Sequence, residues 1–242
     1  MRTSKPETSL NRELIACTRC PRLRKHCEAV ARGEVLPRKA YLEEVRKNTY
    51  WKKPVPDFGT TPSQVLIVGL APAAHGANRT GRMFTGDDSG KWLYRALHKA
   101  GLARTAGYES ASDNELINTC ITATAHCAPP DNKPTTSEIA NCRPFLVKRF
   151  QIAEPKVVLA LGGIAWKSAL DVLTNEMGFE KPKPTPIFSH LAKVELKRRP
   201  QDEKSESLFL IGSYHPSRQN TNTKRLTEPM FDSVFRMVND LL

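Results

Sequence analysis

The chain has 242 residues, of which 39% are hydrophobic, so it is long enough for one domain with a proper core. No apolar run approaches the ~20 residues of a membrane span, and the stretch up to Cys17 lacks the apolar centre of a signal peptide. We therefore expect an intracellular, cytoplasmic protein with no membrane partner. The 37 basic and 25 acidic residues give a net charge of +12, which fits a nucleic-acid partner or simply a solubilising surface.

Predicted helices and strands alternate along the chain. Leu10 to Ala31 is predicted to form two short helical pieces, 40–46 is a candidate helix, and 50–56 is an extended loop stiffened by prolines. Strands are then predicted over 65–68, 116–123, 157–161 and 208–213, and helices over 89–102, 137–150, 164–173 and 229–242. This order predicts a single domain over 1–242, a three-layer α/β/α fold with a central, mostly parallel four-stranded sheet.

Residues 179–207 interrupt this alternation. They are rich in proline and charge and are predicted to be an insertion before the last strand, with Ile187 to Leu196 as a candidate hairpin strand. No role for the insertion follows from the sequence.

The stretch from Gln64 to Asp88 carries the strongest functional signal. Val65 to Val68 is a short, apolar, β-branched run typical of a buried strand, and it passes into a glycine-rich loop followed by a helix. This order is typical of a ligand site in an α/β fold, where the backbone approaches the ligand beyond the carboxyl end of the strand.

Two motifs resemble those of a known family. The letters GLAP (69–72), NRTGR (78–82) and FTGD (84–87) resemble the first motif of the uracil-DNA glycosylase superfamily, and its B-type group, also called family five, is the most similar. The letters SYHPS (213–217) resemble the second signature of that superfamily. Both motifs follow predicted strands, as that fold requires. Together with four cysteines, the resemblance spans Cys17 to Arg225.

The cysteines suggest a metal site. Disulfides are not expected in a cytosolic chain. Cys17 and Cys20 form a C-x2-C pair, while Cys127 and Cys142 flank a polar loop of fourteen residues. Four thiolates serve tetrahedral zinc as well as an iron–sulfur cluster, so the residues alone leave both open.

The resemblance to the B-type group favours iron. It implies a [4Fe–4S] cluster that ties the N-terminal segment, residues 1–60, to the loop after the second strand, with the ligands Cys17, Cys20, Cys127 and Cys142. Cys120, inside a predicted strand, is expected in the core. Cys27 is expected to be a packed or solvent-side thiol rather than a ligand.

The resemblance also implies an activity. It implies a monofunctional DNA glycosylase that hydrolyses the N-glycosidic bond of uracil in DNA, and of deaminated purines such as hypoxanthine, leaving an abasic site. The partner would be double- or single-stranded DNA containing a deaminated base. The protein would be a monomer acting on the nucleoid of a prokaryotic cell. Such an enzyme flips the base out, holds it, stabilises the leaving anion and provides water.

The resemblance assigns the base pocket to Gly69, Ala71, His75, Phe84 and Asn118. Phe84 would be the aromatic wall on which the flipped base stacks; an ordinary core phenylalanine is the alternative. Asn118 would read the base edge, because an amide both donates and accepts hydrogen bonds. A buried structural amide is the alternative there.

His215 is the best candidate catalytic residue. A neutral imidazole that donates an N–H to the base carbonyl would stabilise the leaving anion. The histidine follows a predicted strand and is fixed by Pro216, which distinguishes it from an ordinary core or surface histidine.

The residues after this histidine are candidates for DNA contact. By resemblance they form the loop that enters the minor groove and fills the gap left by the flipped nucleotide, with Ser217, Arg218, Gln219 and Asn220 as its members. A solvated polar loop is the alternative. Lys224 stands where the family pattern Thr-Gly-Arg has glycine, which puts the local turn geometry in doubt.

The position before the first-motif proline is Ala71, where many superfamily members carry Asp or Asn to orient water. This fits the B-type group but removes the obvious general base. Asn78, in the same loop, is the nearest substitute by resemblance, and it would orient water for a dissociative mechanism. Asp87 and Asp88 are weaker candidates because they could cap the following helix.

Two other classes of function remain open. Ala71 would also suit a catalytically silent iron–sulfur DNA-binding protein of the same fold, although Phe84, Asn118 and His215 argue against it. A zinc-stabilised nucleotide or ester hydrolase is the third reading. It is weakened by the lack of a P-loop lysine pattern or a serine-centred elbow. Cleavage of a uracil-containing oligonucleotide would separate the three.

Overall fold

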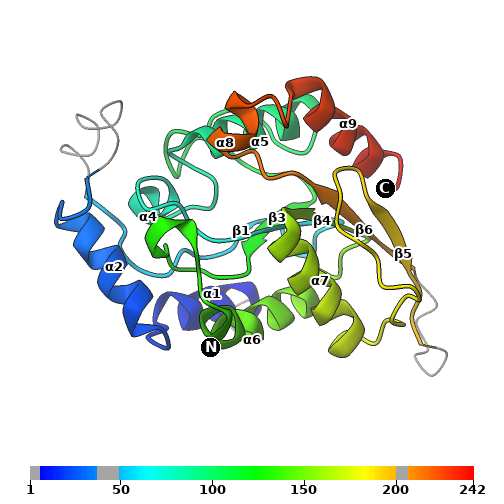
Figure 1. The fold of residues 1–242 in the computed structure, drawn as a ribbon, viewed down its shortest axis with the longest axis horizontal. Helices are drawn as coiled ribbons and strands as arrows, with labels where there is room; N and C mark the ends of the chain where they lie inside the picture. The colour runs from blue at the N-terminus through cyan, green and yellow to red at the C-terminus, as the bar shows by residue number, and fades with distance from the viewer. Residues whose placement is uncertain (1–5, 37–48, 200–206) are drawn as a thin grey trace, which may run out of the picture.

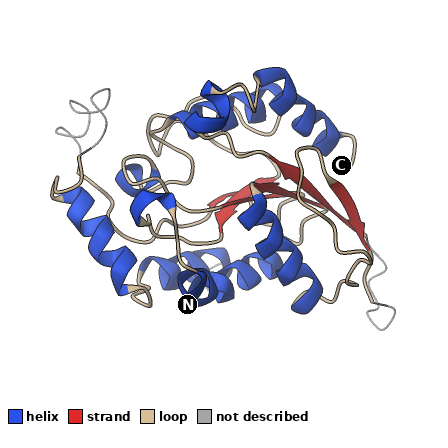
Figure 2. Cartoon of the chain, in the orientation of Figure 1, coloured by secondary structure: helices blue, strands red, loops and turns tan. Residues whose placement is uncertain are grey.

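The computed structural model describes residues 6–36, 49–199 and 207–242 (Figure 1). A sheet lies in the middle of the molecule, with helices on both of its faces (Figure 2). The candidate helix over 40–46 lies outside the described residues. No helix in the described ranges is long and apolar enough to cross a membrane.

The sheet has the strand order β1-β3-β2-β4-β6-β5. The four predicted strands form its parallel centre: β2 (Val65–Gly69), β3 (Thr119–Ala123), β4 (Val157–Leu161) and β6 (Leu208–Ser213). Nearly every residue of these strands is buried, as expected where helices cover both faces.

The predicted number of four strands is wrong. Two short antiparallel strands extend the edges of the sheet, β1 (Phe58–Gly59) beside β3 and β5 (Lys193–Leu196) beside β6. A two-residue strand is too short to show an alternating pattern, which is why the sequence does not reveal β1. The β5 strand lies within the candidate hairpin strand of the insertion.

Helices cover the two faces in pairs. On one face lie α5 (Asp88–Lys99) and α9 (Glu228–Asn239); on the other lie α6 (Thr136–Ala153) and α7 (Gly163–Asn175). The side chains of β2 alternate between the two cores, Ile67 facing α5 and α9 and Val68 facing α6 and α7. Cys120 is fully buried in the second core, as predicted. The predicted α/β class is confirmed.

The N-terminal segment packs against α6. It contains α1 (Pro6–Ile15) and α2 (Pro21–Ala31), the two predicted helical pieces. Leu10 and Leu14 of α1 form a small apolar cluster with Phe145 of α6. Arg22 of α2 makes an ion pair of 2.7 Å with Glu138, which also completes the capping box of α6. These contacts already hold the segment to the domain.

The insertion forms the β5 edge of the sheet. Phe179 is buried and pairs with Arg198 in an isolated bridge, and Leu191 N donates to Gly212 O at 2.8 Å next to β6. Residues 200–206 lie outside the described ranges. The described part is thus integrated into the sheet rather than appended to it.

Candidate active site

The first-motif loop begins at the carboxyl end of β2 and is pinned to the end of β3. Thr124 N donates to Gly69 O, and Ala125 N and Thr124 Oγ1 both donate to Leu70 O, at distances of 3.0, 3.0 and 2.7 Å. The loop then passes Ala71, which is half-buried, and enters the short helix α4 (Ala77–Thr80). The predicted strand and glycine-rich loop are confirmed, and the predicted helix over 89–102 corresponds to α5, whereas the short α4 inside the loop was not predicted. The loop lies where parallel sheets bind ligands.

Gly69, Phe84 and His215 come together at this edge of the sheet. A Cβ on Gly69 would lie 3.0 Å from Cε2 of Phe84, so only glycine lets the ring approach the backbone this closely. The rings of Phe84 and His215 stack with centroids 5.8 Å apart and planes at 28°. His215 follows the carboxyl end of β6. The first and second motifs, which are far apart in the sequence, therefore come together and form one wall of the site.

His215 is held as a neutral imidazole. Burial lowers its pKa to about 4, so the ring carries no charge at neutral pH and can donate one N–H while the other nitrogen accepts. Its carbonyl accepts hydrogen bonds from Ser217 N at 2.7 Å and from Asn220 Nδ2 at 2.8 Å. The backbone of the residue is thereby fixed from its C-terminal side.

Asn78 is completely buried in α4. Its Nδ2 donates to Ala74 O at 3.2 Å, while its Oδ1 has no hydrogen-bond partner among the described residues. A buried amide oxygen without a partner is costly unless a water or a ligand satisfies it. This free acceptor is compatible with the predicted role of orienting water.

His75 is half-buried and is held by a residue of the N-terminal part of the chain. Tyr50 Oη lies 2.9 Å from His75 Nδ1, and the buried Nε2 of His75 has no partner in the described structure. Burial, with nearby Arg79, lowers the pKa of His75 and keeps it neutral. His75 therefore carries a second free polar atom in the first-motif loop.

Asn118 does not lie at the site, and its predicted role is wrong in position. It directly precedes β3, is exposed, and has a left-handed backbone with φ of 47°. In a parallel sheet the amino end of β3 is opposite to the edge that carries Gly69 and His215. The five residues of β3, at ~3.3 Å each, separate the two edges.

The predicted DNA-contacting loop is a short helix, α8 (Arg218–Asn222). Ser217 caps it by accepting from Asn220 N at 3.3 Å, and Arg218 forms an ion pair with Asp88. Gln219 is exposed, whereas Asn220 uses its amide on the His215 carbonyl. Of the four predicted residues, three have partners within the protein.

Asp87 is the N-cap of α5, where its side chain accepts from Gly90 N at 2.9 Å. The expected capping role is confirmed for this residue. Burial raises the pKa of Asp87 to about 6. Its carboxylate lies against Gly76 of the first-motif loop, where an added Cβ would approach Oδ2 to 2.5 Å.

The four predicted cysteine ligands line one cavity between the N-terminal segment and α6. Cys17 and Cys20 enter it from the loop between α1 and α2, Cys142 from α6 and Cys127 from the connection after β3. Within the described ranges, no three or more His, Cys, Asp or Glu side chains form a ready-made metal-binding group. Cys27 is fully buried, donates to Ala128 O at 3.7 Å and packs beside Cys127.

The chemistry of these thiols suits a cation. Burial raises the pKa of Cys142 to about 12, and it raises the pKa of Cys20 as well. The hydrogen bond with Cys27, followed by burial, raises the pKa of Cys127. Cys17 and Cys142 are among the charges that contribute to these shifts, so the thiolates would repel one another. A metal centre would supply the positive charge that stabilises them.

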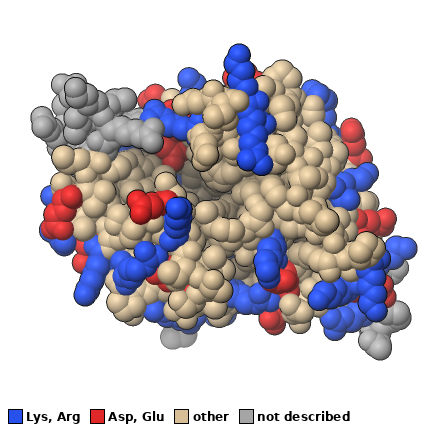
Figure 3. Space-filling view, in the orientation of Figure 1, with Lys and Arg blue, Asp and Glu red and all other residues tan. Residues whose placement is uncertain are grey.

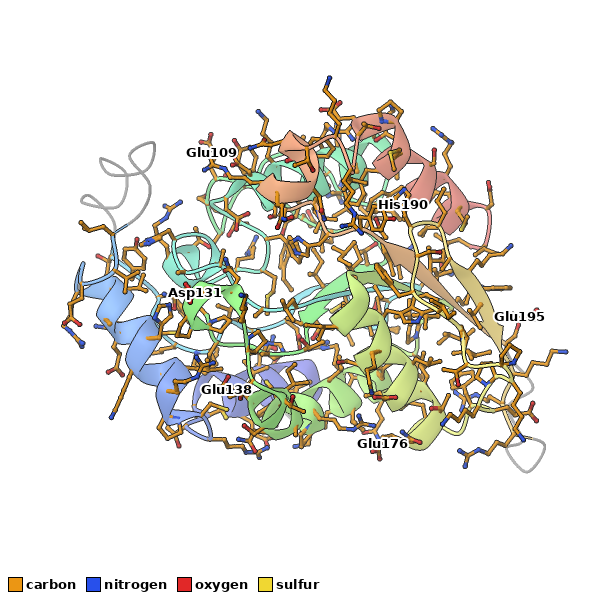
Figure 4. The ribbon with its side chains drawn as sticks, in the orientation of Figure 1. Glu109, Asp131, Glu138, Glu176, His190 and Glu195 are labelled. Carbon is orange, nitrogen blue, oxygen red and sulfur yellow. The ribbon has the colours of Figure 1, made fainter. Side chains whose placement is uncertain are left out.

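Two residues near the site were not predicted. Gly162 has φ of 100° at the end of β4, where a Cβ would lie 3.7 Å from Cβ of His215. His190, from the insertion, lies between the sheet edge at β6 and α9 (Figure 4). Gly162 directly follows a buried strand, which is a feature that could have indicated it from the sequence. Nothing in the local sequence distinguishes His190.

The space-filling view shows a hollow in the face that carries α4 and α8 (Figure 3). Uncharged side chains line it, and both basic and acidic side chains stand around its rim. An uncharged hollow suits a nucleobase, and the basic side chains on the same face suit a phosphate backbone.

Comparison with known proteins agrees with these features. The sequence model of the uracil DNA glycosylase superfamily matches residues 56–239. A type-5 uracil-DNA glycosylase of Mycobacterium tuberculosis is 43% identical over 235 residues, which cover 96% of this chain and 80% of the relative. A type-5 enzyme of Thermus thermophilus is 42% identical over 219 residues, 90% of both chains. A type-4 uracil-DNA glycosylase of Archaeoglobus fulgidus is 26% identical over 164 residues, 67% of this chain and 70% of the relative. The chain therefore belongs to the uracil DNA glycosylase superfamily and, within it, to the type-5 group.

Proposed function

We propose that the protein hydrolyses the N-glycosidic bond of uracil in DNA and leaves an abasic site. The observation that carries the proposal is the contact between Phe84 and His215 over Gly69, since it joins an aromatic wall and a neutral imidazole at the ligand-binding edge of the sheet. Membership of the type-5 group supports the same reaction.

In the proposed mechanism the uracil nucleotide leaves the DNA stack and its base packs on Phe84. The bond between C1′ of the sugar and N1 of the base breaks, and the electron pair stays on the base. His215 donates an N–H to the carbonyl oxygen on which this negative charge accumulates, and a neutral donor suffices because it need not give up its proton. The uracil anion later takes a proton from solvent.

Water completes the reaction on the sugar. The cationic C1′ accepts the oxygen of a water molecule, which then loses a proton to solvent. Asn78 Oδ1, buried and without a partner, would accept a hydrogen bond from that water and orient it. Little base strength is needed if the sugar cation forms before the attack, so an amide can replace a carboxylate here.

Deaminated purines are proposed as additional substrates. Ala71 places only a methyl group at the position where many superfamily members carry a longer polar side chain. The space left there would accommodate the second ring of hypoxanthine. Ala71 offers no group to activate water, so Asn78 orients the water in the proposed mechanism.

DNA is proposed to bind across the face that carries the hollow. Gln219 at the exposed side of α8 would contact the DNA next to the lesion, while Ser217, Arg218 and Asn220 set the shape of the helix. Lys and Arg side chains on this face would neutralise phosphates (Figure 3).

We also propose that the four cysteines hold a [4Fe–4S] cluster. All four line one cavity, and burial opposes ionisation of Cys142 and Cys20 in the absence of a cation. A cluster would add covalent links between the α1–α2 loop, α6 and the connection after β3. Its role in the proposal is structural.

The test of the function is cleavage of a 5′-labelled duplex with a single uracil. Abasic sites break on heating in alkali, so the uracil strand should be cut and the same strand with thymine should stay intact. Binding of the uracil duplex without any cleavage would instead support the catalytically silent DNA-binding alternative and would refute the proposed reaction.

A further inference from the structure

The insertion places His190 directly against the residue that precedes His215. The imidazole of His190 stacks on the ring of Tyr214, with centroids 5.1 Å apart and planes at 24°. The guanidinium of Arg225 also lies over the Tyr214 ring, 4.6 Å from its centroid. Tyr214 is therefore contacted by His190, which precedes the second motif in the sequence, and by Arg225, which follows it.

A hydrogen bond fixes the same peptide. Tyr214 N donates to His190 Nδ1 at 3.3 Å, and Ser213 Oγ lies 3.5 Å from the same nitrogen. A ring nitrogen that accepts from a backbone N–H carries no proton, so the His190 proton must be on Nε2. Nε2 is buried and has no hydrogen-bond partner among the described residues, although the backbone of Met230 in α9 lies near the ring. Burial lowers the pKa of His190, which keeps Nδ1 available as an acceptor.

The segment that carries His190 is itself well anchored. Trp166 Nε1 donates to Pro186 O at 3.4 Å, and the ring of Phe188 contacts Tyr214 edge-on with centroids 6.3 Å apart. On the other side, Gly212 N donates to Ala192 O at 2.8 Å. His190 thus sits in a short stretch that is fixed to α7 before it and to β6 after it.

We propose that His190 is a positioning residue for the glycosylase reaction, which orients His215 by holding the Tyr214 peptide. The inference rests on the proposed function. Asn220 holds the carbonyl of His215 from the C-terminal side, at 2.8 Å, and His190 holds the preceding peptide from the N-terminal side. The imidazole of His215 must face both Phe84 and the base, and a displacement of about 1 Å at a catalytic group costs on the order of a hundredfold in rate.

The acceptor at the δ position provides a selective test. In His190→Asn the amide Oδ1 occupies the place of Nδ1 and accepts from Tyr214 N, whereas in His190→Gln the polar atoms lie one bond too far. His190→Leu removes the acceptor altogether. His98→Leu is the matched control, because His98 is an exposed histidine on α5 whose ring nitrogen lies 3.2 Å from the backbone oxygen of Ala103.

Single-turnover uracil excision at saturating enzyme should fall at least tenfold in His190→Gln and His190→Leu, and it should stay within about threefold of wild type in His190→Asn and His98→Leu. The affinity for uracil DNA should change little in all four. Equal rates in His190→Asn and His190→Gln would overturn the inference, as would losses that merely follow the folded fraction measured by circular dichroism. An inactive wild-type protein would instead refute the proposed function.

Discussion

The backbone at Phe84 shows how individual residues shape the site. Phe84 has φ of 56°, a left-handed conformation that is unusual for a bulky residue and costs free energy. Its neighbours impose it: Tyr94 Oη donates to Met83 O at 2.9 Å, and the Phe84 carbonyl packs on Gly90, where a Cβ would approach it to 1.9 Å. The strain is maintained by α5 and directs the aromatic ring towards Gly69.

Asn78 is expected to act in catalysis more than in binding. Replacing it with alanine removes the buried Oδ1 that would orient water, so the single-turnover rate on uracil DNA should fall at least tenfold while the dissociation constant changes less than threefold. Rate constants at saturating enzyme and binding isotherms measure the two effects. If the variant keeps the wild-type rate constant, Asn78 only braces the loop and His75 becomes the next candidate.

Asp87 should make stability depend on pH. Its folded pKa, about 6, lies above the ordinary value of 3.8, so the folded state binds a proton that the unfolded state releases between these two values. The contribution of Asp87 to the free energy of unfolding therefore falls as pH rises through this window and stays low above pH 6. In Asp87→Asn this loss is absent, while an asparagine still caps α5.

The melting temperature of Asp87→Asn relative to wild type should accordingly rise between pH 4 and pH 6 and then level off. Thermal melts at half-unit steps of pH measure this difference, and a gain of about 2 °C or more at pH 7.5 is expected. A difference that does not vary with pH would show that the carboxyl group is not protonated in the folded state in this window.

At the scale of elements, the sequence predicts the parallel centre of the sheet well. The runs over 65–68, 157–161 and 208–211 are continuous apolar stretches, which are typical of strands covered on both faces. The prediction fails at 116–123 because strand pairing begins only at Thr119. Leu116 pairs with Ala103 instead, and the left-handed backbone of Asn118 cannot continue a strand.

This boundary error does not explain the misplacement of Asn118. A strand that began at Leu116 would still end at Ala123, so Asn118 lies near the amino end in either case; its assignment to the base pocket rests on the family resemblance alone. The contacts of His190 cannot be read from the sequence, because they depend on the pairing of β5 with β6, and neither β5 nor His190 belongs to a motif. The wall formed by Phe84 and His215, by contrast, follows from motifs alone.

The proposed cluster would link the α1–α2 loop, α6 and the connection after β3. Serine in place of any one of the four predicted ligands should abolish or sharply lower the iron and sulfide content, because serine does not replace a thiolate towards iron. Cys120→Ala changes a buried residue of β3 and should leave the metal content as in wild type. Iron and acid-labile sulfide are measured in anaerobically purified protein. Zinc without iron would keep the four ligands and contradict the cluster.

At the scale of the whole molecule, the three layers and the N-terminal segment converge on the same edge of the sheet. A buried ion pair between Asp57 and Arg149, 2.8 Å apart, fixes the chain before β1 to α6, with His126 beside it. This network lies next to the cysteine cavity, which His126 also lines. The first-motif loop, α8 and the cysteine cavity are thus built on one connected framework, which the proposed binding of a flipped base requires.

The central claim is that neutral His215, stacked beside Phe84, stabilises the leaving uracil anion. The most direct measurement is the single-turnover rate of uracil excision by His215→Ala at saturating enzyme. The account predicts a fall of about a hundredfold or more, the scale for losing one donor to a developing anion, with binding of uracil DNA retained and with a flat wild-type rate between pH 6 and 8 because the pKa of His215 is about 4. A variant that excises uracil at the wild-type rate would contradict the account.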